Sequence, residues 1–380
     1  MATKKPLALY AGTVKELQSG DDVANPAAHA SQHYPAGADP VNAFAFHGFV
    51  NRTDSTMSFN STNRTFTIAG TFVYHYQGNK ITVSTSPTVQ ITNTTGLWYI
   101  YFAANGTLTA SQSFPSFATT VIMAFVWWNG SFGTLYDERH GYQRNIDWHN
   151  WAHQTIGARY GAGLALTTAG SGGTATFQIA SGNIWDEDIN FTIAQQTTAR
   201  CWYQTGASTY TFDTTAITTP FRWSGASVQF VDSTNAYALT VCANNRFVNV
   251  WVYGANNLTT PIKMFVETIA GSTGYTSVAN ARIANPPSLL SMGLSPEMKL
   301  LYRIVVRGDG VIQAAVAADD YRSVSSLPGG GTSSISAASV TLAPVGDVSS
   351  TNVQSGIAEL DAKKASINQA FVAAIAVCKP

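Results

Sequence analysis

The stretch TFTIAGTFVYHYQGNKITV, residues 65–83, alternates apolar and polar side chains along three short runs. A period of two is typical of β-strands, because successive side chains then point to opposite faces of a sheet. The runs are separated by Ala69-Gly70 and Gly78-Asn79, and glycine or asparagine supplies the positive φ angles that tight hairpin turns require. This stretch therefore predicts consecutive antiparallel strands joined by hairpins.

The same pattern continues outward from this stretch in both directions. Apolar runs at 96–102 and 121–128 lie on either side of the turn Asn105-Gly106, and similar short runs recur as far as residue 318. Many short strands at regular spacing are typical of sandwiches and barrels. We therefore expect a mainly β chain with two antiparallel β-sandwich-like modules, residues 44–160 and 161–323.

The two ends of the chain have a different composition. Residues 1–43 contain Pro26, Pro35 and Pro40, which remove backbone donors and disfavour helix in the residues before them. We expect an extended arm there that lies against another protein. Residues 324–348 are rich in glycine and serine and are typical of a flexible linker.

A helix is expected in the last segment, residues 349–380. Thr351 and Gln354 fit a capping box at its start. Apolar side chains then follow at the a and d positions of heptads, which predicts a helix that packs against copies of itself, although Lys364 interrupts the seam. The predicted oligomerisation residues are Val353, Ile357, Leu360, Ile367 and Phe371.

The composition argues against several classes of partner. Charged residues make up only 11% of the chain, and 21 Lys and Arg balance 21 Asp and Glu, so there is no basic field for nucleic acid. No apolar run is long enough for a spanning helix, so we expect no membrane insertion. The start lacks a signal-peptide core, and we expect synthesis in the cytoplasm without export. The three cysteines are expected to be reduced.

Two polar clusters carry candidate chemistry. His140, His149 and His153 lie near carboxylates, and the i, i+4 spacing of the last two places them on one face of a helix, as metal ligands can be. No H-E-x-x-H motif is present, so a hydrogen-bonded turn between the modules is the favoured interpretation. The run 186–188, Asp-Glu-Asp, could bind Ca²⁺ or serve a glycosidase, but a solvated loop end is favoured. We assign no catalytic, cofactor-binding or metal residues.

Aromatic residues are abundant, with 9 Trp, 16 Tyr and 19 Phe. Rings that face outward from a sandwich with a polar surface can stack on sugar faces. The residues predicted for such a glycan-binding patch are Trp202, Trp223 and Trp251.

Three segments resemble virion proteins of tailed bacteriophages. Residues 5–21 are similar to the "K-P-L … L-x-x-G-D" start of phage fiber and appendage proteins, and residues 29–40 resemble the "H-x-x-x-H … G-x-D-P" linker that often follows. Residues 348–361 are similar to the "T-x-V-Q-x-A-I-x-E-L-D" coiled-coil entry of tail fibers. The span from Gly48 to Gly141 also looks like a β module of phage structural proteins.

The resemblance implies a non-enzymatic structural protein of a tailed-phage virion. It would be a homotrimeric short fiber or appendage that docks on a tail or head protein and presents its β domains to the host surface, where it could bind glycan. The expected attachment residues are Pro6, Leu7, Leu9, Tyr10 and Leu17. Two alternatives remain, a tailspike that depolymerises polysaccharide and a capsid decoration or head fiber protein without a receptor role. No cofactor is expected.

Overall fold

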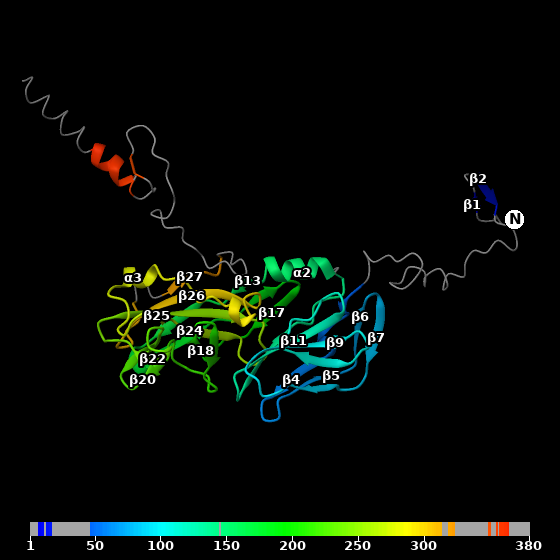
Figure 1. The fold of residues 1–380 in the computed structure, drawn as a ribbon, viewed down its shortest axis with the longest axis horizontal. Helices are drawn as coiled ribbons and strands as arrows, with labels where there is room; N and C mark the ends of the chain where they lie inside the picture. The colour runs from blue at the N-terminus through cyan, green and yellow to red at the C-terminus, as the bar shows by residue number, and fades with distance from the viewer. Residues whose placement is uncertain are drawn as a thin grey trace, which may run out of the picture.

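The computed structural model describes residues 7–10, 13–16, 46–143, 146–313, 318–323, 349–350, 355 and 357–364. The described chain is mainly β and is built from several small sheets in which most neighbouring strands are antiparallel, which confirms the expected class (Figure 1). The attachment residues Pro6 and Leu17 lie outside the described residues, as do the heptad residues Val353, Ile367 and Phe371.

The stretch that predicted the fold forms strands as expected but pairs differently from expectation. The strands β5 (Thr65–Ala69), β6 (Phe72–Tyr76) and β7 (Asn79–Val83) are all present, and β6 and β7 form the predicted hairpin. The strand β5 instead pairs with β4 (Thr56–Asn60) and β8 (Thr88–Gln90) in a second sheet. Gly70 (φ +115°) therefore marks a change of sheet, where a Cβ would lie 2.4 Å from the Asp54 carbonyl oxygen.

We call residues 46–143 the first region and residues 158–313 with 318–323 the second region. The centre of the first region is a four-stranded antiparallel sheet with the order β10-β9-β11-β12. Every residue of β11 is buried, so both faces of this strand are covered. The strands are β9 (Gly96–Ala103), β10 (Leu108–Ser111), β11 (Thr120–Trp128) and β12 (Gly133–Asp137). A short strand β3 (Gly48–Phe49) pairs with β6, and the 3-10 helix η2 (Arg52–Asp54) precedes β4.

The second region is built on a six-stranded sheet with the order β19-β18-β24-β23-β26-β27. Its strands are β18 (Arg200–Gly206), β19 (Thr209–Phe212), β23 (Phe247–Ala255), β24 (Ile262–Val266), β26 (Met298–Arg307) and β27 (Ala318–Asp320). The pair β18–β24 is parallel, with Arg200 opposite Lys263, so the expectation of purely antiparallel pairing is wrong here.

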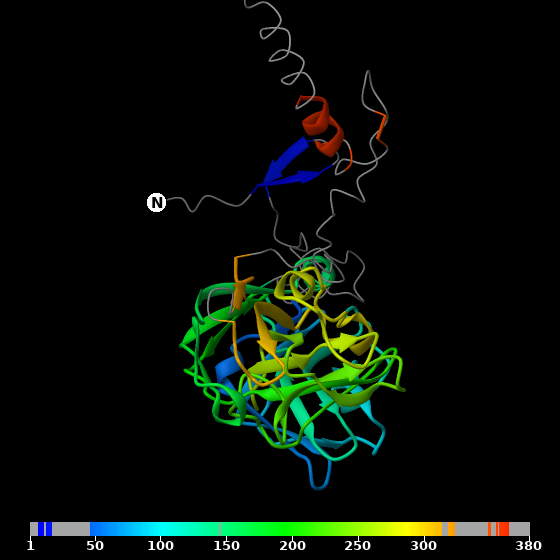
Figure 2. The same ribbon diagram turned by 90° about the vertical axis from the view of Figure 1, so that its left-hand side faces the viewer.

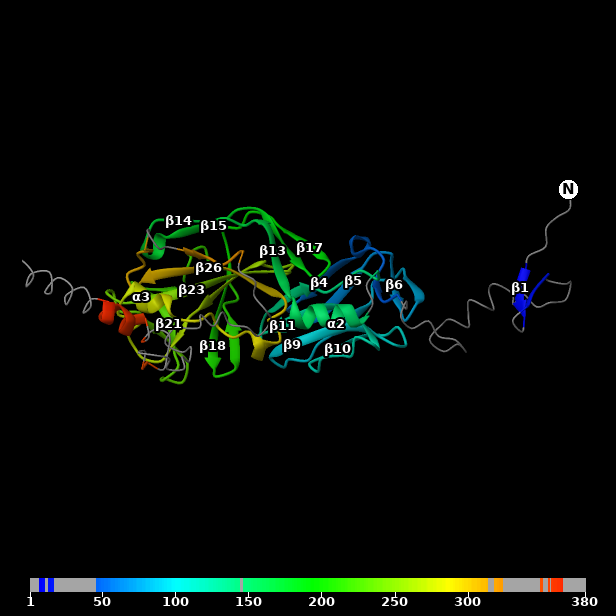
Figure 3. The same cartoon turned by 90° about the horizontal axis from the view of Figure 1, so that it is seen from above.

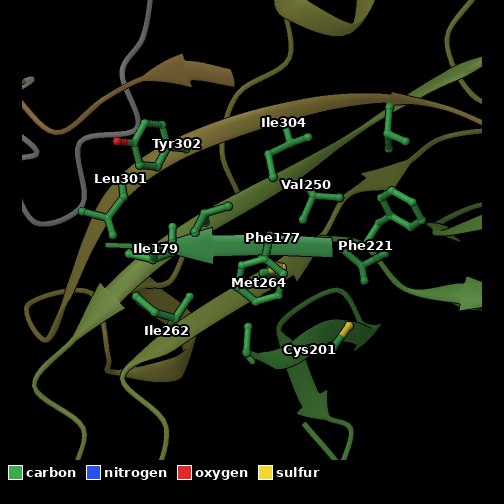
Figure 4. Packing of buried hydrophobic residues seen from close by; sticks show 14 of the residues in the cluster. Phe177, Ile179, Cys201, Phe221, Val250, Ile262, Met264, Leu301, Tyr302 and Ile304 are labelled. Atoms are coloured by element: carbon green, nitrogen blue, oxygen red, sulfur yellow. The ribbon is translucent and has the colours of Figure 1, made fainter. Parts of the chain in front are cut away.

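Smaller sheets cover this large sheet and enclose an apolar core with it. Phe177, Phe221 and Met264 are buried in that core together with the free thiol of Cys201, as Figure 4 shows. The covering strands are β13 (Ala158–Gly163), β14 (Leu166–Ala169), β15 (Thr176–Ile179), β16 (Gly182–Asp186), β17 (Ile189–Ile193), β20 (Trp223–Ser224), β21 (Ser227–Asp232), β22 (Ala238–Val241) and β25 (Thr268–Ile269).

The remaining elements are helices and the N-terminal hairpin. The helices α2 (Ile146–Thr155) and α3 (Val278–Arg282) lie on the same side of the β body, as Figures 1 and 2 show. Two 3-10 helices, η3 (Gly172–Thr174) and η4 (Leu290–Met292), lie in connections of the second region. The strands β1 (Leu7–Tyr10) and β2 (Thr13–Glu16) pair with each other, and residues 357–364 are helical.

The two regions share an aromatic cluster at their junction. Tyr99 and Trp127 from the first region pack in it with Trp202, Trp251 and Phe265 from the second, and all five are buried. Helix α2 lies over the strands of the first region and reaches this junction at one end, as Figure 3 shows. A helix and a continuous apolar cluster therefore join the two regions.

Candidate functional site

A buried group of histidines and carboxylates lies beside this junction, where four segments of the chain meet. They are the end of β12 with the residues after it, helix α2, the turn between β16 and β17, and the residue before β26. We call this group the histidine–carboxylate cluster. Its members are Glu138, His140, His149, His153, Asp186, Glu187, Asp188 and Glu297.

The segment that leads into the cluster is fixed by a fully paired ion pair. Arg139 donates to both carboxylate oxygens of Asp137, from Nε at 2.8 Å and from Nη2 at 2.7 Å. The Nη1 group of Arg139 donates to the carbonyl oxygens of Arg52 and Ser55, both at 2.6 Å. Because both partners are buried with their hydrogen bonds made, this fork holds the backbone around residue 138 in place.

His140 is oriented by Asp188 on one side and faces Glu138 on the other. Its Nδ1 lies 2.5 Å from Asp188 Oδ1, and the second oxygen of Asp188 accepts a hydrogen bond from the Gly141 backbone N–H at 2.8 Å. Its Nε2 lies 3.4 Å from Glu138 Oε2 but makes no hydrogen bond. The Nδ1 atom of His140 is therefore held by the Asp188 carboxylate, while Nε2 points at the Glu138 carboxylate.

Helix α2 places His149 and His153 on one face, as their spacing predicts, and both rings approach Glu187. The Nδ1 of His149 lies 2.8 Å from Glu187 Oε2, and the Nδ1 of His153 lies 3.4 Å from Glu187 Oε1 and 3.7 Å from Glu297 Oε1. Glu187 has a left-handed backbone (φ 49°), which is uncommon for a side chain of this size. This backbone strain lies in the turn that carries all three carboxylates of residues 186–188.

The innermost carboxylates belong to Glu138, Asp186 and Glu297, whose exposed fractions are 2%, 0% and 0%. Each has a buried oxygen without a hydrogen-bond partner, and Glu297 has two. Ligand atoms of Glu138, His153 and Glu297 lie within 4.8 Å of one another, and the same holds for Glu138, His140 and Asp186. A third such group contains His140, His149 and Glu187.

Burial controls the protonation of these acids. It raises the pKa of Glu138 to about 7, with the neighbouring charge of Asp186 as a second cause. Burial and the charge of Glu297 hold the pKa of Asp186 well above its ordinary value, and burial with the charge of Glu138 does the same for Glu297. Three acids that cannot all ionise together therefore meet at one point.

Among the residues around these three acids, His140 and Glu187 favour their charged forms. Burial alone would lower the pKa of His140, but the charge of Glu187 and the contact with Asp188 raise it well above its ordinary value. Burial alone would raise the pKa of Glu187, but the charge of His140 and the contacts with His149 and His153 lower it. Burial and the charge of His140 lower the pKa of His149 to about 4. The cluster thus contains a charged pair, His140 and Glu187, a neutral His149, and inner acids that favour the protonated form.

A small cavity of about 30 Å³ adjoins the cluster and is lined by Glu138, His140, His149 and Asp188, among others. A space of this size holds about one water molecule or one ion. Larger ligands would require the surrounding side chains to move.

The sequence indicates one part of this site and is misleading for another part. His140, His149 and His153 were recognised as candidate ligands, but residues 146–155 form a helix rather than the expected turn. The interpretation of residues 186–188 as a solvated loop end is wrong, because Asp186 is fully buried and the Glu187 carboxylate is inaccessible. Glu297 was missed, since no local pattern links residue 297 to residues 138–153.

The predicted glycan-binding residues do not form an exposed patch. Trp202 and Trp251 have no exposed surface, because both rings pack in the aromatic cluster between the regions. Trp223 is partly buried, and its Nε1 donates to the Gly225 carbonyl oxygen. The expectation of outward-facing rings is therefore wrong for Trp202 and Trp251, although Trp251 belongs to the lining of a surface hollow.

The predicted attachment and oligomerisation residues are described only in part. Leu7, Leu9 and Tyr10 belong to strand β1, which pairs with β2. Ile357 and Leu360 lie on the C-terminal helix with exposed fractions of 58% and 55%.

A second hollow lies on the surface of the second region. It has a volume of about 450 Å³, and Gln204, Ser208, Tyr210, Tyr237 and Ser288 contribute to its lining. Hydroxyl and amide groups beside tyrosine rings suit a polar ligand with flat apolar faces.

In the comparisons with known proteins, no family model matches the sequence, no curated protein matches it, and no solved structure matches the fold. Within the part of the chain that the structure describes, no helix is long and apolar enough to span a membrane.

Proposed function

We propose that this chain is a structural protein of a tailed-phage virion, a short homotrimeric fiber or appendage. It docks through its N-terminal arm, residues 1–43, on a tail or head protein, and presents two β-sandwich-like modules for attachment to the host surface. The order of the fiber-like motifs along the chain motivates this proposal, and it requires neither a cofactor nor catalysis.

The observation that carries the proposal is the exposure of the heptad residues Ile357 and Leu360. Both side chains are more than half exposed in the single chain, although they occupy the positions at which a coiled coil buries its seam. A helix with a narrow apolar stripe is marginal alone in water and gains stability by packing against copies of itself. Two further copies of this chain are therefore the proposed occupants of this face.

The separate apolar cores support two modules. One cluster draws its buried residues from positions 49–135 and another from positions 164–306, which fall inside the two proposed modules. Each module thus has an interior of its own, and the aromatic cluster joins the two. A rigid two-module body is suited to holding a binding surface away from the particle.

The polar hollow of the second region is the proposed receptor-binding surface. Its volume lies within the range of small-molecule sites, and its hydroxyl, amide and tyrosine lining matches the chemistry of a saccharide. The carboxylates of residues 186–188, which would serve a depolymerase, are instead enclosed among histidines. We therefore favour binding of host glycan over its cleavage.

The direct test is to locate the chain in purified virions by cryo-electron microscopy. We expect threefold density that projects from the tail or the head, with residues 1–43 at the attachment point. Absence of the chain from intact particles would overturn the proposal. Particles that carry Tyr237→Ala should assemble normally but bind host cells less well, and unchanged binding would reject the receptor assignment.

A further inference from the structure

We propose that the histidine–carboxylate cluster is a structural metal centre that takes one divalent first-row transition-metal ion. This inference does not depend on the proposed virion function, because it rests on the geometry of buried side chains alone. The proposed ligands are Glu138, His140, Asp186, His153 and Glu297.

The proposed ligands already converge. Two groups of three potential ligands share Glu138, and the ligand atoms of each group lie within 4.8 Å of one another. Metal–ligand bonds of about 2.0–2.2 Å place ligands on opposite sides of an ion about 4 Å apart, so side-chain movements of a few tenths of an ångström can close such a shell. Glu138 belongs to both groups, so it would be a ligand of an ion bound by either of them.

These ligand atoms lack hydrogen-bond partners although they are buried. His140 Nε2, His153 Nδ1, Glu138 Oε1, Asp186 Oδ1 and both oxygens of Glu297 have none. Buried polar atoms are rarely left unpaired, because the lost solvation costs about 1–3 kcal/mol per group. Six such atoms on residues of the two neighbouring groups are explained if these residues bind a cation.

The outer residues provide the second shell that metal ligands usually have. Asp188 lies 2.5 Å from Nδ1 of His140, which leaves Nε2 as the free donor, as in carboxylate–histidine–metal arrangements. Glu187 Oε2 lies 2.8 Å from Nδ1 of His149, which is not a proposed ligand. Asp188 fixes the imidazole ring of His140 and is a positioning residue rather than a ligand.

A cation would compensate the charge that the cluster has when all of its carboxylates are ionised. The cluster contains five carboxylates and three imidazoles, so even full protonation of the histidines would leave a formal charge of −2. Buried charges need compensation, because their solvation by water is lost. A divalent ion supplies this compensation at the point where the inner acids meet, whereas the alternative is a set of shared protons.

The ligand types indicate the class of metal. Mixed imidazole and carboxylate ligands suit Mn²⁺, Fe²⁺, Co²⁺ and Zn²⁺, while dominant thiolates or an all-oxygen shell would indicate other ions. The ligands come from the segment after β12, from α2, from β16 and from the residue before β26. An ion bound by these four segments would fasten the junction between the two regions.

The test uses the full-length chain, refolded from urea in the presence of Mn²⁺, Co²⁺ or Zn²⁺, since a buried site fills most readily during folding. After gel filtration, elemental analysis should give one bound ion per chain. The Co²⁺ form should show d–d absorption of a protein-bound ion. The melting temperature should rise by roughly 5–10 °C relative to chain refolded with chelator.

Variants locate the ion within the chain. Glu138→Gln and His153→Gln keep the side-chain size and should each lose the bound ion and the rise in melting temperature. His75→Gln, which alters a histidine outside the cluster, should retain both, as should the double variant His29→Gln/His33→Gln in the N-terminal arm. If a cluster variant fails to fold, the spectrum and stoichiometry of the wild-type chain still decide whether the chain binds an ion.

Two results would overturn the proposal. One is a folded wild-type chain that retains none of the three ions and shows no change in melting temperature, which would leave shared protons as the compensating charge. The other is an ion that survives both cluster substitutions, or that disappears in the His75 or His29/His33 variants, because it would then be bound elsewhere.

Discussion

At the scale of single residues, Glu267 shows how burial makes stability depend on pH. Its carboxylate accepts hydrogen bonds from the Asn249 backbone N–H at 2.7 Å, from the Asn249 side chain at 2.9 Å and from the Tyr275 hydroxyl at 3.0 Å. These donors favour the ionised form, but burial outweighs them and raises the pKa of Glu267 from 4.5 to about 7.

We predict that this residue makes the protein less stable as the pH rises from about 4.5 to about 7. In that window the folded chain retains the proton and the unfolded chain has lost it, so the free energy of unfolding falls with pH by up to about 3 kcal/mol. Above pH 7 the Glu267 contribution becomes constant. Urea unfolding at intervals between pH 4.5 and 8 measures this slope.

The variant Glu267→Gln has no proton to lose and should flatten the slope in this pH window. Other groups titrate in both proteins, so the difference between the wild-type and variant curves isolates Glu267. If the wild-type and variant stability curves stay parallel across the window, burial does not raise the pKa of Glu267.

The chemistry of the candidate site was visible in the sequence only where it is local. His149 and His153 share a helix face because their spacing of four residues sets their direction. Adjacent residues are harder to interpret, since side chains alternate in direction along a strand. Asp186 ends β16 facing inward, and the left-handed backbone at Glu187 turns the next side chain inward as well. No local rule predicts that both side chains point inward, or that Glu297 lies beside them.

At the scale of elements, the same distinction separates the confirmed strands from the unexpected pairings. The hairpin β6–β7 depends on a Gly-Asn turn between its two strands, so the sequence specifies it locally. The parallel pair β18–β24 joins residues about 60 positions apart and depends on the whole sheet. Gly70 shows the limit of prediction from local sequence, because a residue with a positive φ can lie at a change of sheet as well as in a hairpin turn.

The C-terminal helix allows a test of self-association. The double variant Ile357→Asp/Leu360→Asp puts charges into the proposed seam, and we expect it to convert a trimer into monomers. Each buried charge would cost several kcal/mol of association free energy, which is more than three short heptads can offset. Native mass spectrometry and sedimentation equilibrium at micromolar concentration measure the mass directly.

A matched control is available on the same helix. Ala362 is exposed and lies at a heptad position away from Ile357 and Leu360, so Ala362→Asp adds a charge outside the seam and should leave the trimer intact. A wild-type chain that is monomeric at these concentrations would contradict the prediction, and so would equal dissociation by both variants.

At the scale of the whole molecule, the aromatic cluster determines whether the two regions behave as one folding unit. Trp202 of β18 has no exposed surface, and its ring centroid lies 5.7 Å from that of Trp127 in β11 and 5.6 Å from that of Phe265 in β24. Separating the regions would expose this cluster to water, which costs about 25 cal/mol for each Å² of apolar surface. The junction therefore couples the stability of one region to that of the other.

We predict that both regions unfold in a single transition and that Trp202→Ala weakens both. Loss of a buried tryptophan costs about 3–5 kcal/mol, and the resulting cavity touches side chains of both regions. Hydrogen exchange of β6 amides in the first region and of β21 amides in the second should accelerate together in the variant. Trp185→Ala is the control, because Trp185 is 41% exposed and its removal should cost much less. If β21 amides lose protection while β6 amides keep theirs, the aromatic cluster is only a contact between two independently stable regions.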